Sequence, residues 1–574
     1  MRGSPSPSGP AALFSSGSPR FLERDLAEIA ARDGAPAAWI AAFDRHGKLA
    51  PVHVHGDFAV AVRDRAGCVF LAVDRFSIRT LCYRMVDDEI AVHPRADVLA
   101  GPGGLRDPQA IFDYLYFHNI PAPRTIFSAV QRLPAGHCGK FENGRLAVER
   151  WWNPVFVEDR PVPFETLRDE FLELLRDCVE RQTEGDSIAC FLSGGTDSST
   201  VAGMVAAVTG RPPQTFSIGF HAEGYDEMHY ARIAARHFKT DHHEYYVTPD
   251  DLVASISQVA ASYDQPFGNS SVVPAYYCAK LARESGAAKI LGGDGGDELF
   301  GGNSRYAKQR VFGVYDHLPR SFRSSLLEPL LGGSGPFTRL PLIRKAASYV
   351  EQARVPMPDR LQMYNLLTRM GLAEVLTPEF LGSVDPESQM RQQRAVYAAT
   401  DARSPINRML AFDWKYTLAD NDLPKVIGAT SLAGISAGLP LLDDSLVDFS
   451  LRLEPRLKLK GLTLRWFFKE ALRGFLPDEI IAKKKHGFGL PFGPWCLSHP
   501  ALGKLAHDSI ESILTRGIVR PEFARTLLSK LVPEAPGYYG ELVWILMILE
   551  LWFQRGDTGS APSPWHIDER RPAR

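Results

Sequence analysis

A glycine-rich loop at residues 193–199, SGGTDSS, has the residue types of a phosphate-binding loop. It follows an apolar run and precedes a segment of small residues, so we expect a strand before it and a helix after it. Glycines let the backbone approach an anion closely, and the free amides at the start of a helix face it. The loop lacks the lysine of the GxxxxGK[ST] motif, and it places Asp197 beside the phosphates, where a bridging divalent cation makes a carboxylate favourable. These features favour a magnesium pyrophosphate site over an ordinary glycine-rich turn.

A second glycine-rich segment, ILGGDGGDELFGG at residues 290–302, carries Asp294, Asp297 and Glu298. Such a cluster could be a solvated turn or a calcium loop, but the DxDxDG spacing of an EF-hand is absent from it. One carboxylate positioned opposite Asp197 could complete the magnesium site, and another could serve as a general base.

Three motifs occur in the order FLSGGTDSS, GGDGGDELFGG and KKKHGFGLPFGPW, and together they resemble the synthetase domain of the asparagine synthetase family. The resemblance covers roughly residues 165–553. Upstream, GDFAVAVRD, LAVDRFSIRTLCY and RTIFSAVQRLPAGH resemble the glutaminase domain that precedes the synthetase domain in that family. The first motif also matches the SGGxDS signature of ATP pyrophosphatases, which cleave ATP between the α and β phosphates and form adenylates.

The resemblance implies a role for each matching position, with ATP and Mg²⁺ as cofactors. The expected adenosine contacts are Leu192, Ile218, Gly292 and Gly293. The expected pyrophosphate contacts are Ser193, Gly194, Gly195, Asp197 and Ser198, and the expected magnesium ligands are Asp197 and Asp297. Asp294 would be the base that deprotonates the attacking nitrogen, and Lys485, in KxxF spacing, would stabilise charge on the phosphates. Without the motif, Lys485 beside Lys483 and Lys484 would read as a solvated basic patch.

The N-terminal domain departs from the pattern of a working glutaminase. Glutamine-hydrolysing members begin with a cysteine nucleophile, whereas here Met1 is followed by Arg2 and the first cysteine is Cys68. The RGPD and NGE segments for glutamine are also missing from the first fifty residues, and the resemblance implies that roughly forty residues of the domain are lacking. We therefore predict no glutaminase nucleophile and a structural remnant, unless the true start lies upstream. Ammonia could then come from a separate protein.

The acceptor region departs as well. Where family members commonly show KVDRxS, ExRxPFLD and DEPF, this chain has Ile427, Gly428, Ser436, Gly438 and Gln265 in place of charged residues. Loss of charge weakens the case for a free zwitterionic aspartate as the acceptor. The alternative is that these positions only pack around the site. β-Lactam synthetases and lasso-peptide cyclases share the synthetase fold without a working glutaminase and use an internal amine.

The leading hypothesis is an ATP-dependent amide-forming ligase that makes AMP and pyrophosphate, with aspartate as the default acid and ammonia or an amine as the nucleophile. The rival is a ligase of the β-lactam-synthetase or peptide-cyclase type that acts on a specialised carboxylate. A non-catalytic relative is a third reading, opposed by the intact Asp197, Asp297 and Lys485.

The predicted secondary structure around these residues changes along the chain from mostly β to alternating strands and helices. From His53 to about Trp152, short apolar runs alternate with turn residues, which predicts a mostly β domain. After Pro161, strands alternate with helices of ten to fifteen residues, which predicts βαβ units and a parallel sheet. The expected fold class is α/β. With the resemblance, it comprises a glutaminase-like (Ntn-hydrolase-type) α+β domain and an adenine-nucleotide α-hydrolase-like domain with a helical C-terminal part.

We expect a disordered leader at 1–20, the degenerate glutaminase-like domain at 21–155, the ATP pyrophosphatase domain at 165–553, and a disordered tail at 555–574. The net charge of −2 is too small to indicate binding to nucleic acid or to a membrane. Seven scattered cysteines without a CxxC pair argue against disulfides and structural zinc. The longest apolar run, at 542–549, is far shorter than the ~20 residues of a membrane span, so we expect a cytoplasmic protein. A homodimer is the expected assembly.

Overall fold

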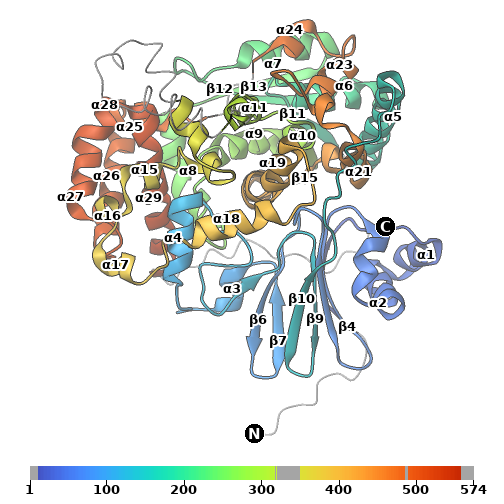
Figure 1. Ribbon diagram of the computed structural model, residues 1–574, viewed down its shortest axis with the longest axis horizontal. Coiled ribbons are helices and arrows are strands. Elements are labelled where there is room, and N and C mark those ends of the chain that lie inside the picture. Colours follow the sequence, from blue (N-terminus) through green and yellow to red (C-terminus); the bar gives the residue numbers. More distant parts are fainter. Residues whose placement is uncertain (1–10, 186, 317–318, 320–348, 485–488, 558–574) are drawn as a thin grey trace.

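The computed structural model describes residues 11–185, 187–316, 319, 349–484 and 489–557. Its N-terminal part contains an antiparallel sheet in the order β1-β4-β5-β9-β10, drawn in the lower half of Figure 1. The strands are β1 (Ala11–Gly17), β4 (Phe58–Arg63), β5 (Val69–Val73), β9 (His137–Glu142) and β10 (Arg145–Arg150). Strands β4 and β5 are apolar on both faces because both faces are covered.

One face of this sheet packs against α1 (Arg24–Asp33) and α2 (Ala35–His46), where Trp39 contributes to the core. The other face packs with a small antiparallel sheet, β7-β6-β8. The remaining elements of this part are β2 (Arg20–Phe21), η1 (Gly47–His53), β3 (Val54–His55), β6 (Cys82–Val86), β7 (Glu89–His93), α3 (Ala96–Ala100), α4 (Pro108–Phe117) and β8 (Gln131–Arg132). The predicted strand-rich α+β domain is confirmed.

The expectation of a disordered leader to residue 20 is wrong for its second half. Residues 11–17 form β1, which pairs antiparallel with β4 from Ala11 opposite Arg63 to Gly17 opposite Phe58. The strand is held by backbone hydrogen bonds to a buried neighbour, so its Ser- and Gly-rich composition does not prevent order. Residues 1–10 lie outside the described part of the chain.

The second domain is built on a parallel sheet in the order β13-β12-β11-β14-β15, with every neighbouring pair parallel. Its strands are β11 (Ile188–Phe191), β12 (Gln214–Phe220), β13 (Asp241–Val247), β14 (Lys289–Leu291) and β15 (Ser436–Gly438). Helix α5 (Phe164–Thr183) precedes β11, and the helices that follow strands of this sheet include α6 (Thr196–Thr209), α7 (Met228–Phe238), α8 (Pro249–Ser262), α9 (Val272–Glu284) and α10 (Gly296–Phe300). This confirms the predicted parallel-sheet fold, whose loops at the carboxyl ends of strands are the usual ligand sites.

Helices dominate the rest of the chain, as expected. They are α11 (Ser304–Asp316), η4 (Asp359–Gln362), α15 (Leu366–Met370), α16 (Leu372–Val375), α17 (Pro378–Gly382), α18 (Ser388–Ala398), α19 (Pro405–Asp413), η5 (Trp414–Asp422), α20 (Leu423–Ala433), η6 (Pro440–Leu442), α21 (Asp444–Arg452), α22 (Pro455–Lys458), α23 (Trp466–Ala471), α24 (Asp478–Ala482), α25 (Phe492–Ser498), α26 (Pro500–Leu514), α27 (Pro521–Thr526), η7 (Leu527–Leu531), α28 (Val532–Glu534) and α29 (Pro536–Asp557). A two-stranded pair, β16 (Leu459–Lys460) with β17 (Thr463–Leu464), interrupts them.

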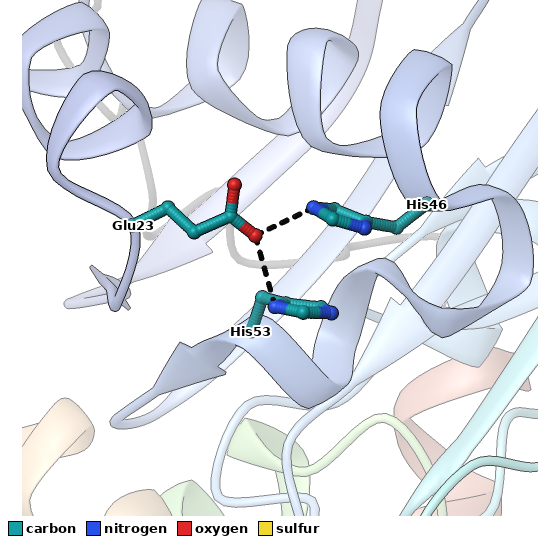
Figure 2. A group of neighbouring side chains, drawn as sticks. All are labelled: Glu23, His46 and His53. Carbon is teal, nitrogen blue, oxygen red and sulfur yellow. Dashed lines mark ion pairs between the residues drawn. The ribbon is translucent and has the colours of Figure 1, made fainter.

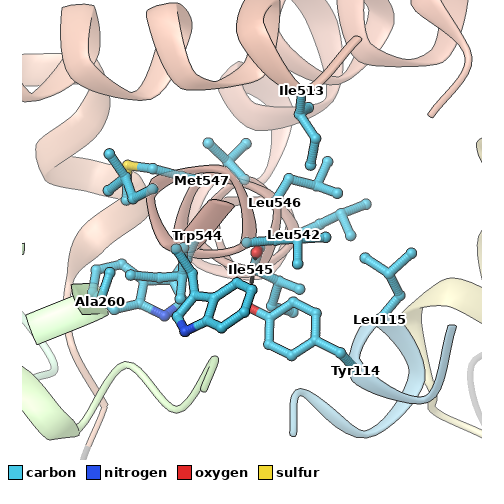
Figure 3. Packing of buried hydrophobic residues seen from close by; sticks show 14 of the residues in the cluster. Tyr114, Leu115, Ala260, Ile513, Leu542, Trp544, Ile545, Leu546 and Met547 are labelled. Carbon is cyan, nitrogen blue, oxygen red and sulfur yellow. Dashed lines mark hydrogen bonds between the residues drawn. The ribbon is translucent and has the colours of Figure 1, made fainter. Parts of the chain in front are cut away.

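The apolar run at 542–549 lies in the middle of α29, and every residue of it is at most 1% exposed. Figure 3 shows Leu542, Trp544 and Leu546 projecting from different sides of this helix into the core. Such a helix is apolar all round because protein surrounds it. Helix α29 continues to Asp557, so the disorder expected from residue 555 is wrong for residues 555–557, and residues 558–574 lie outside the described part. No helix among the described residues is long and apolar enough to span a membrane.

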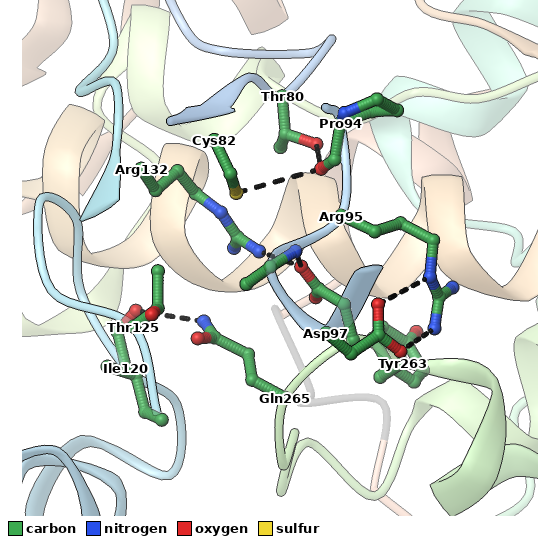
Figure 4. A network of polar contacts seen from close by, with 12 residues as sticks. Thr80, Cys82, Pro94, Arg95, Asp97, Ile120, Thr125, Arg132, Tyr263 and Gln265 are labelled. Atoms are coloured by element: carbon green, nitrogen blue, oxygen red, sulfur yellow. Dashed lines mark hydrogen bonds and ion pairs between the residues drawn. The ribbon is translucent and has the colours of Figure 1, made fainter. Parts of the chain in front are cut away.

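The two domains are joined by a polar network around the turn that follows α8 (Figure 4). Asp264 accepts a hydrogen bond from Arg132 at 2.6 Å and another from the backbone amide of Ala96 at 2.8 Å. Next to it, Gln265 accepts from the amide of Ile126 at 3.3 Å and is 6% exposed. Gln265 is therefore a packing residue between the two domains.

Candidate active site

The phosphate loop is placed by β11 and opens α6, as its sequence predicts. The amide of Leu192 donates to Phe216 at 2.9 Å, which extends the pairing of β11 with β12 into the loop. Gly194 has φ +65°, and a Cβ there would lie 2.3 Å from the backbone of Tyr230 and Ala231. The loop thus needs glycine at this position for its conformation as well as for its packing.

Serine hydroxyl groups form hydrogen bonds within the phosphate loop. The hydroxyl oxygen of Ser198 accepts a hydrogen bond from the Ser193 amide at 3.1 Å and lies 3.0 Å from the Ser193 hydroxyl. Gly195 is the N-cap of α6, and Asp197 lies in the first turn of that helix. The predicted phosphate contacts thus lie at the start of α6, where free first-turn amides favour an anion.

The second loop lies against the first. Gly292 continues β14 by donating to the Gly438 carbonyl at 2.8 Å. A Cβ at Gly293 would lie 2.6 Å from the amide nitrogen of Ser198, and one at Gly296 would lie 2.1 Å from Asp197 Oδ1. The glycines of ILGGDGGDELFGG thus allow α10 to approach the start of α6 directly.

Asp197 and Asp297 converge on one cation, Arg465. This guanidinium donates to Asp197 Oδ2 at 2.7 Å and to Asp297 Oδ1 at 2.8 Å, and it also contacts Asp197 Oδ1. Arg465 is the N-cap of α23, has the left-handed φ of +55°, and is 5% exposed. The two carboxylates oppose the effect of burial and hold the pKa of Arg465 above its usual value. The structure therefore brings the two predicted metal ligands together.

Two further lysines lie at this site. Lys469, one turn after Arg465 on α23, has its pKa lowered by burial and by the neighbouring Arg465 charge. Lys483 lies 3.4 Å from the Gly194 carbonyl oxygen and 3.2 Å from Glu227, with its ammonium 4.5 Å from the centre of the Tyr230 ring. Both belong to the cationic surroundings of the phosphate loop, and neither was predicted.

The predicted adenosine residues fall into two groups. Leu192, Ser193 and Ile218 line one small pocket beside the phosphate loop, together with Tyr225 and Met228. Gly292 and Gly293 lie instead on the second loop, where Gly293 touches the start of α6. The pocket thus brings together half of the residues expected around adenosine.

Asp294, the predicted base, lies beside a lysine from α20. Lys425 Nζ is 3.4 Å from Asp294 Oδ1 and 3.2 Å from Asp422 Oδ1. Burial raises the pKa of Asp294, and the Lys425 ammonium limits that rise. A carboxyl group with a raised pKa is suited to accept a proton near neutral pH. Lys485, the other predicted catalytic residue, lies outside the described residues.

The uncharged acceptor positions are tightly packed. A Cβ at Gly428 would lie 2.2 Å from the hydroxyl oxygen of Tyr263, and one at Gly438 would lie 2.4 Å from Gln182 Oε1. Gly428 and Gly438 therefore serve packing in this chain and leave no room for larger side chains. Ser436 is exposed at the start of β15 and donates to the Ala288 carbonyl at 3.0 Å.

A pocket of about 570 Å³ lies apart from these residues, between the 121–131 segment of the N-terminal domain and helices α18 and η5. Two cations line it, and both are paired. Arg124 contacts Asp107 at 2.9 Å and Asp113 at 3.0 Å, while Lys415 contacts Asp420 at 3.0 Å. The pocket contains none of the predicted site residues.

The N-terminal domain offers no exposed thiol among its described residues. Its cysteines, Cys68, Cys82 and Cys138, are all buried. Burial raises the pKa of each of these thiols to about 11. A thiol in such a setting is a poor nucleophile near neutral pH.

The fold defines an α/β protein in which two glycine-rich loops, each following a strand of one parallel sheet, lie against each other. The asparagine synthase family model matches residues 170–554, and a glutamine amidotransferase domain model matches residues 37–152. The chain belongs to the asparagine synthase family, whose members are ATP-dependent amide ligases.

Named relatives agree with this assignment. The chain is 22% identical to asparagine synthetase [glutamine-hydrolyzing] 1 of Bacillus subtilis over 523 residues, covering 89% of this chain and 79% of the relative. It is also 22% identical to asparagine synthetase [glutamine-hydrolyzing] 3 of the same organism, over 75% of this chain and 67% of that one. A rice relative, asparagine synthetase [glutamine-hydrolyzing] 2, is 30% identical over 29% of this chain and 30% of its own.

Proposed function

We propose that the chain transfers AMP from ATP to a substrate carboxylate, releases pyrophosphate, and then lets a nitrogen nucleophile displace AMP. The observation that carries this proposal is the convergence of Asp197 and Asp297 on Arg465 beside the first turn of α6. A loop of this kind would hold phosphates by backbone amides and through a cation bound to its carboxylates, without the lysine of an ordinary triphosphate loop. This composition supports cleavage between the α and β phosphates.

The two aspartates fit a divalent cation. Both already surround one buried positive charge, and the space for it depends on glycines, since a Cβ at Gly302 would lie 1.6 Å from Asp297 Oδ1. Oxygen donors of this kind suit Mg²⁺. In the proposed enzyme Asp197 and Asp297 would hold Mg²⁺, which would neutralise charge developing on the pyrophosphate.

Several residues of the chain would act in the first step, the formation of the adenylate. The amides at the start of α6, with Ser193 and Ser198, orient the phosphates. Arg465 and Lys469 supply fixed positive charge, and preorganised charges of this type lower the barrier because they need no rearrangement during the reaction. Lys485 completes this set in the proposal. Leu192 and Ile218 would contact the adenosine.

Asp294 is proposed to act in the second step. Burial raises the pKa of Asp294, so its carboxylate can take a proton from the attacking nitrogen, and the neighbouring Lys425 ammonium favours the ionised form. The nitrogen is expected to arrive as free ammonia, from a separate ammonia-delivering protein, or as an amine of the substrate. We propose that the N-terminal domain does not hydrolyse glutamine, which the buried cysteines support.

Aspartate is the acid that the names of the relatives suggest. A second candidate, a larger specialised carboxylate, is favoured by the packing at Gly428 and Gly438, because charged side chains there would displace Tyr263 and Gln182. A site with fewer charges suits a free zwitterion less well.

Acid-dependent exchange of pyrophosphate into ATP tests both candidates, because it reports adenylate formation without requiring the correct nucleophile. Aspartate should support exchange if it is the substrate. Exchange with another acid of a panel, and none with aspartate, would establish the second candidate. Cleavage of ATP to ADP and phosphate in the presence of every acid would refute the proposed adenylation.

A further inference from the structure

A cluster of two histidines and one glutamate lies in the N-terminal domain (Figure 2). Glu23 is the N-cap of α1, His46 is the last residue of α2, and His53 is the last residue of η1. Within the described ranges these residues form a group whose possible ligand atoms all lie within 4.8 Å of one another. The three side chains therefore come from three different elements to one point.

Both imidazole rings contact the same carboxylate oxygen, Glu23 Oε1. Glu23 Oε1 lies 2.6 Å from His46 Nε2 and 2.9 Å from His53 Nδ1, and the two rings stack with centroids 3.9 Å apart and an interplanar angle of 13°. Despite the short distance, the buried His46 Nε2 makes no hydrogen bond of acceptable geometry. A hydrogen-bonded pair would align this ring nitrogen with its acceptor. One nitrogen of His46, one nitrogen of His53 and one oxygen of Glu23 thus lie close together, and His46 Nε2 has no hydrogen bond to any of the described residues.

The backbone fixes this convergence. Strands β2 and β3 pair with Phe21 opposite Val54, and the Leu22 amide donates to the His53 carbonyl at 2.9 Å, so Glu23 and His53 start from adjacent positions. Helix α2 packs against α1 and brings His46 to the same place. The site is therefore built by secondary structure and does not depend on a flexible loop.

The second oxygen of the glutamate is held by a charged neighbour. Arg45 contacts Glu23 Oε2 and Asp25 Oδ2, which leaves Oε1 facing the imidazoles. Hydrogen bonding of a ligating carboxylate by an outer group is a regular feature of metal sites, because it fixes the orientation of the ligand. Arg45 and Asp25 together add no net charge next to the cluster.

We propose that Glu23, His46 and His53 bind a divalent cation of the zinc class. Two imidazole nitrogens and one carboxylate oxygen are a regular three-ligand set for zinc, whereas Mg²⁺ and Ca²⁺ prefer oxygen donors. The side chains are 20% to 35% exposed, so water can complete the coordination. The site is separate from the proposed nucleotide site.

The bound metal would have a structural role. It would tie the start of α1, the end of α2 and η1 to the β2–β3 pair. Residues at the ends of that pair contact the second domain, since Arg20 lies 2.7 Å from Asp443 and the Gly56 amide donates to Asp444 at 2.6 Å. Metal binding should therefore stabilise the N-terminal domain and its attachment to the ligase domain.

Titration of the full chain with Zn²⁺, after treatment with a chelator, tests the proposal. We expect one tightly bound equivalent, visible absorption bands of a tetrahedral site when Co²⁺ replaces Zn²⁺, and a rise in the temperature of unfolding with metal. His46→Asn and His53→Asn should each weaken binding at least about 10-fold and abolish the Co²⁺ bands. The near-isosteric Glu23→Gln should weaken binding in the same way while preserving the fold.

His55→Asn is the matched control, because His55 is close in sequence but outside the cluster, and it should bind metal like the parent. Absence of stoichiometric binding by the parent chain would overturn the proposal. So would undiminished binding by the His46→Asn/His53→Asn double variant, which retains all seven cysteines. None of these measurements depends on ligase activity.

Discussion

Asp294 and Lys425 are the residues on which the second chemical step of the proposal depends. The side chain of Asp294 is 20% exposed and lies beside Lys425, and partial burial raises the pKa of its carboxyl group. Asp294 pairs with Lys425, whereas Asp197 and Asp297 contact Arg465. In the proposal, Asp197 and Asp297 therefore stabilise the leaving pyrophosphate, and Asp294 accepts the proton.

Asp294→Asn should therefore uncouple the two steps. Removal of the base is expected to lower amide formation by about 10²- to 10⁴-fold while acid-dependent pyrophosphate exchange continues. Both rates are measured on the same preparation, with the exposed Asp250→Asn as the control. Equal losses of exchange and amide formation would show that Asp294 acts before the adenylate forms.

Lys458 makes stability depend on pH. It is 1% exposed, donates to Asn407 Oδ1 at 2.9 Å, and burial lowers its pKa to about 7 from 10.5. Between these values the unfolded chain binds more protons than the folded chain, so the free energy of unfolding should rise with pH in that window. The contribution of this group is at most about 1.4 kcal/mol per pH unit.

Denaturant unfolding between pH 7 and pH 10 measures this effect. Lys458→Met should flatten the slope of the unfolding free energy with pH relative to the parent chain. An unchanged slope in the variant would assign the pH dependence to other groups.

At the scale of elements, the two glycine-rich loops could be predicted because each follows its own strand of one parallel sheet. Arg465 could not be predicted as their partner, because it reaches Asp297 from 168 residues further along the chain and its short segment carries no distinct motif. Lys483 could not be distinguished from the neighbouring Lys484 by sequence, since only the fold brings it to Gly194. Strand β1 was missed because its order depends on backbone pairing with β4, which its composition does not reveal.

Helix α29 is the element on which the C-terminal core depends. Leu546, which is 1% exposed, is surrounded by other buried side chains (Figure 3). Leu546→Ala should lower the free energy of unfolding by about 2–5 kcal/mol, because it removes buried apolar surface and leaves a cavity. Leu497→Ala, at a position that is 50% exposed in α25, should change it by less than about 0.5 kcal/mol. A similar effect of both changes, measured by denaturant unfolding, would contradict the packing described.

At the scale of the whole molecule, the N-terminal domain is attached to the ligase domain by ion pairs and backbone contacts. The pairs of Asp264 with Arg132, Arg20 with Asp443, and Arg75 with Asp444 all cross the boundary. These contacts explain how a domain without a demonstrated nucleophile can contribute to the structure of the whole chain.

Asp264→Leu should loosen this attachment. It leaves the Arg132 guanidinium without its carboxylate, which we expect to cost about 1–3 kcal/mol, because the pair is partly buried. The double variant Arg132→Met/Asp264→Leu should cost less than the sum of the single changes, since both remove the same pair. Additive losses, measured by unfolding and by protease resistance of the full chain, would show that the pair contributes nothing to the interface.

Pyrophosphate exchange by the parent chain and by Asp197→Asn is the most direct test of the proposed adenylation. The account predicts acid-dependent exchange by the parent and a loss of at least about 100-fold in the variant, because Asp197 is one of the two carboxylates proposed to hold Mg²⁺ at the pyrophosphate. Exchange that continues at the parental rate in Asp197→Asn would contradict the account.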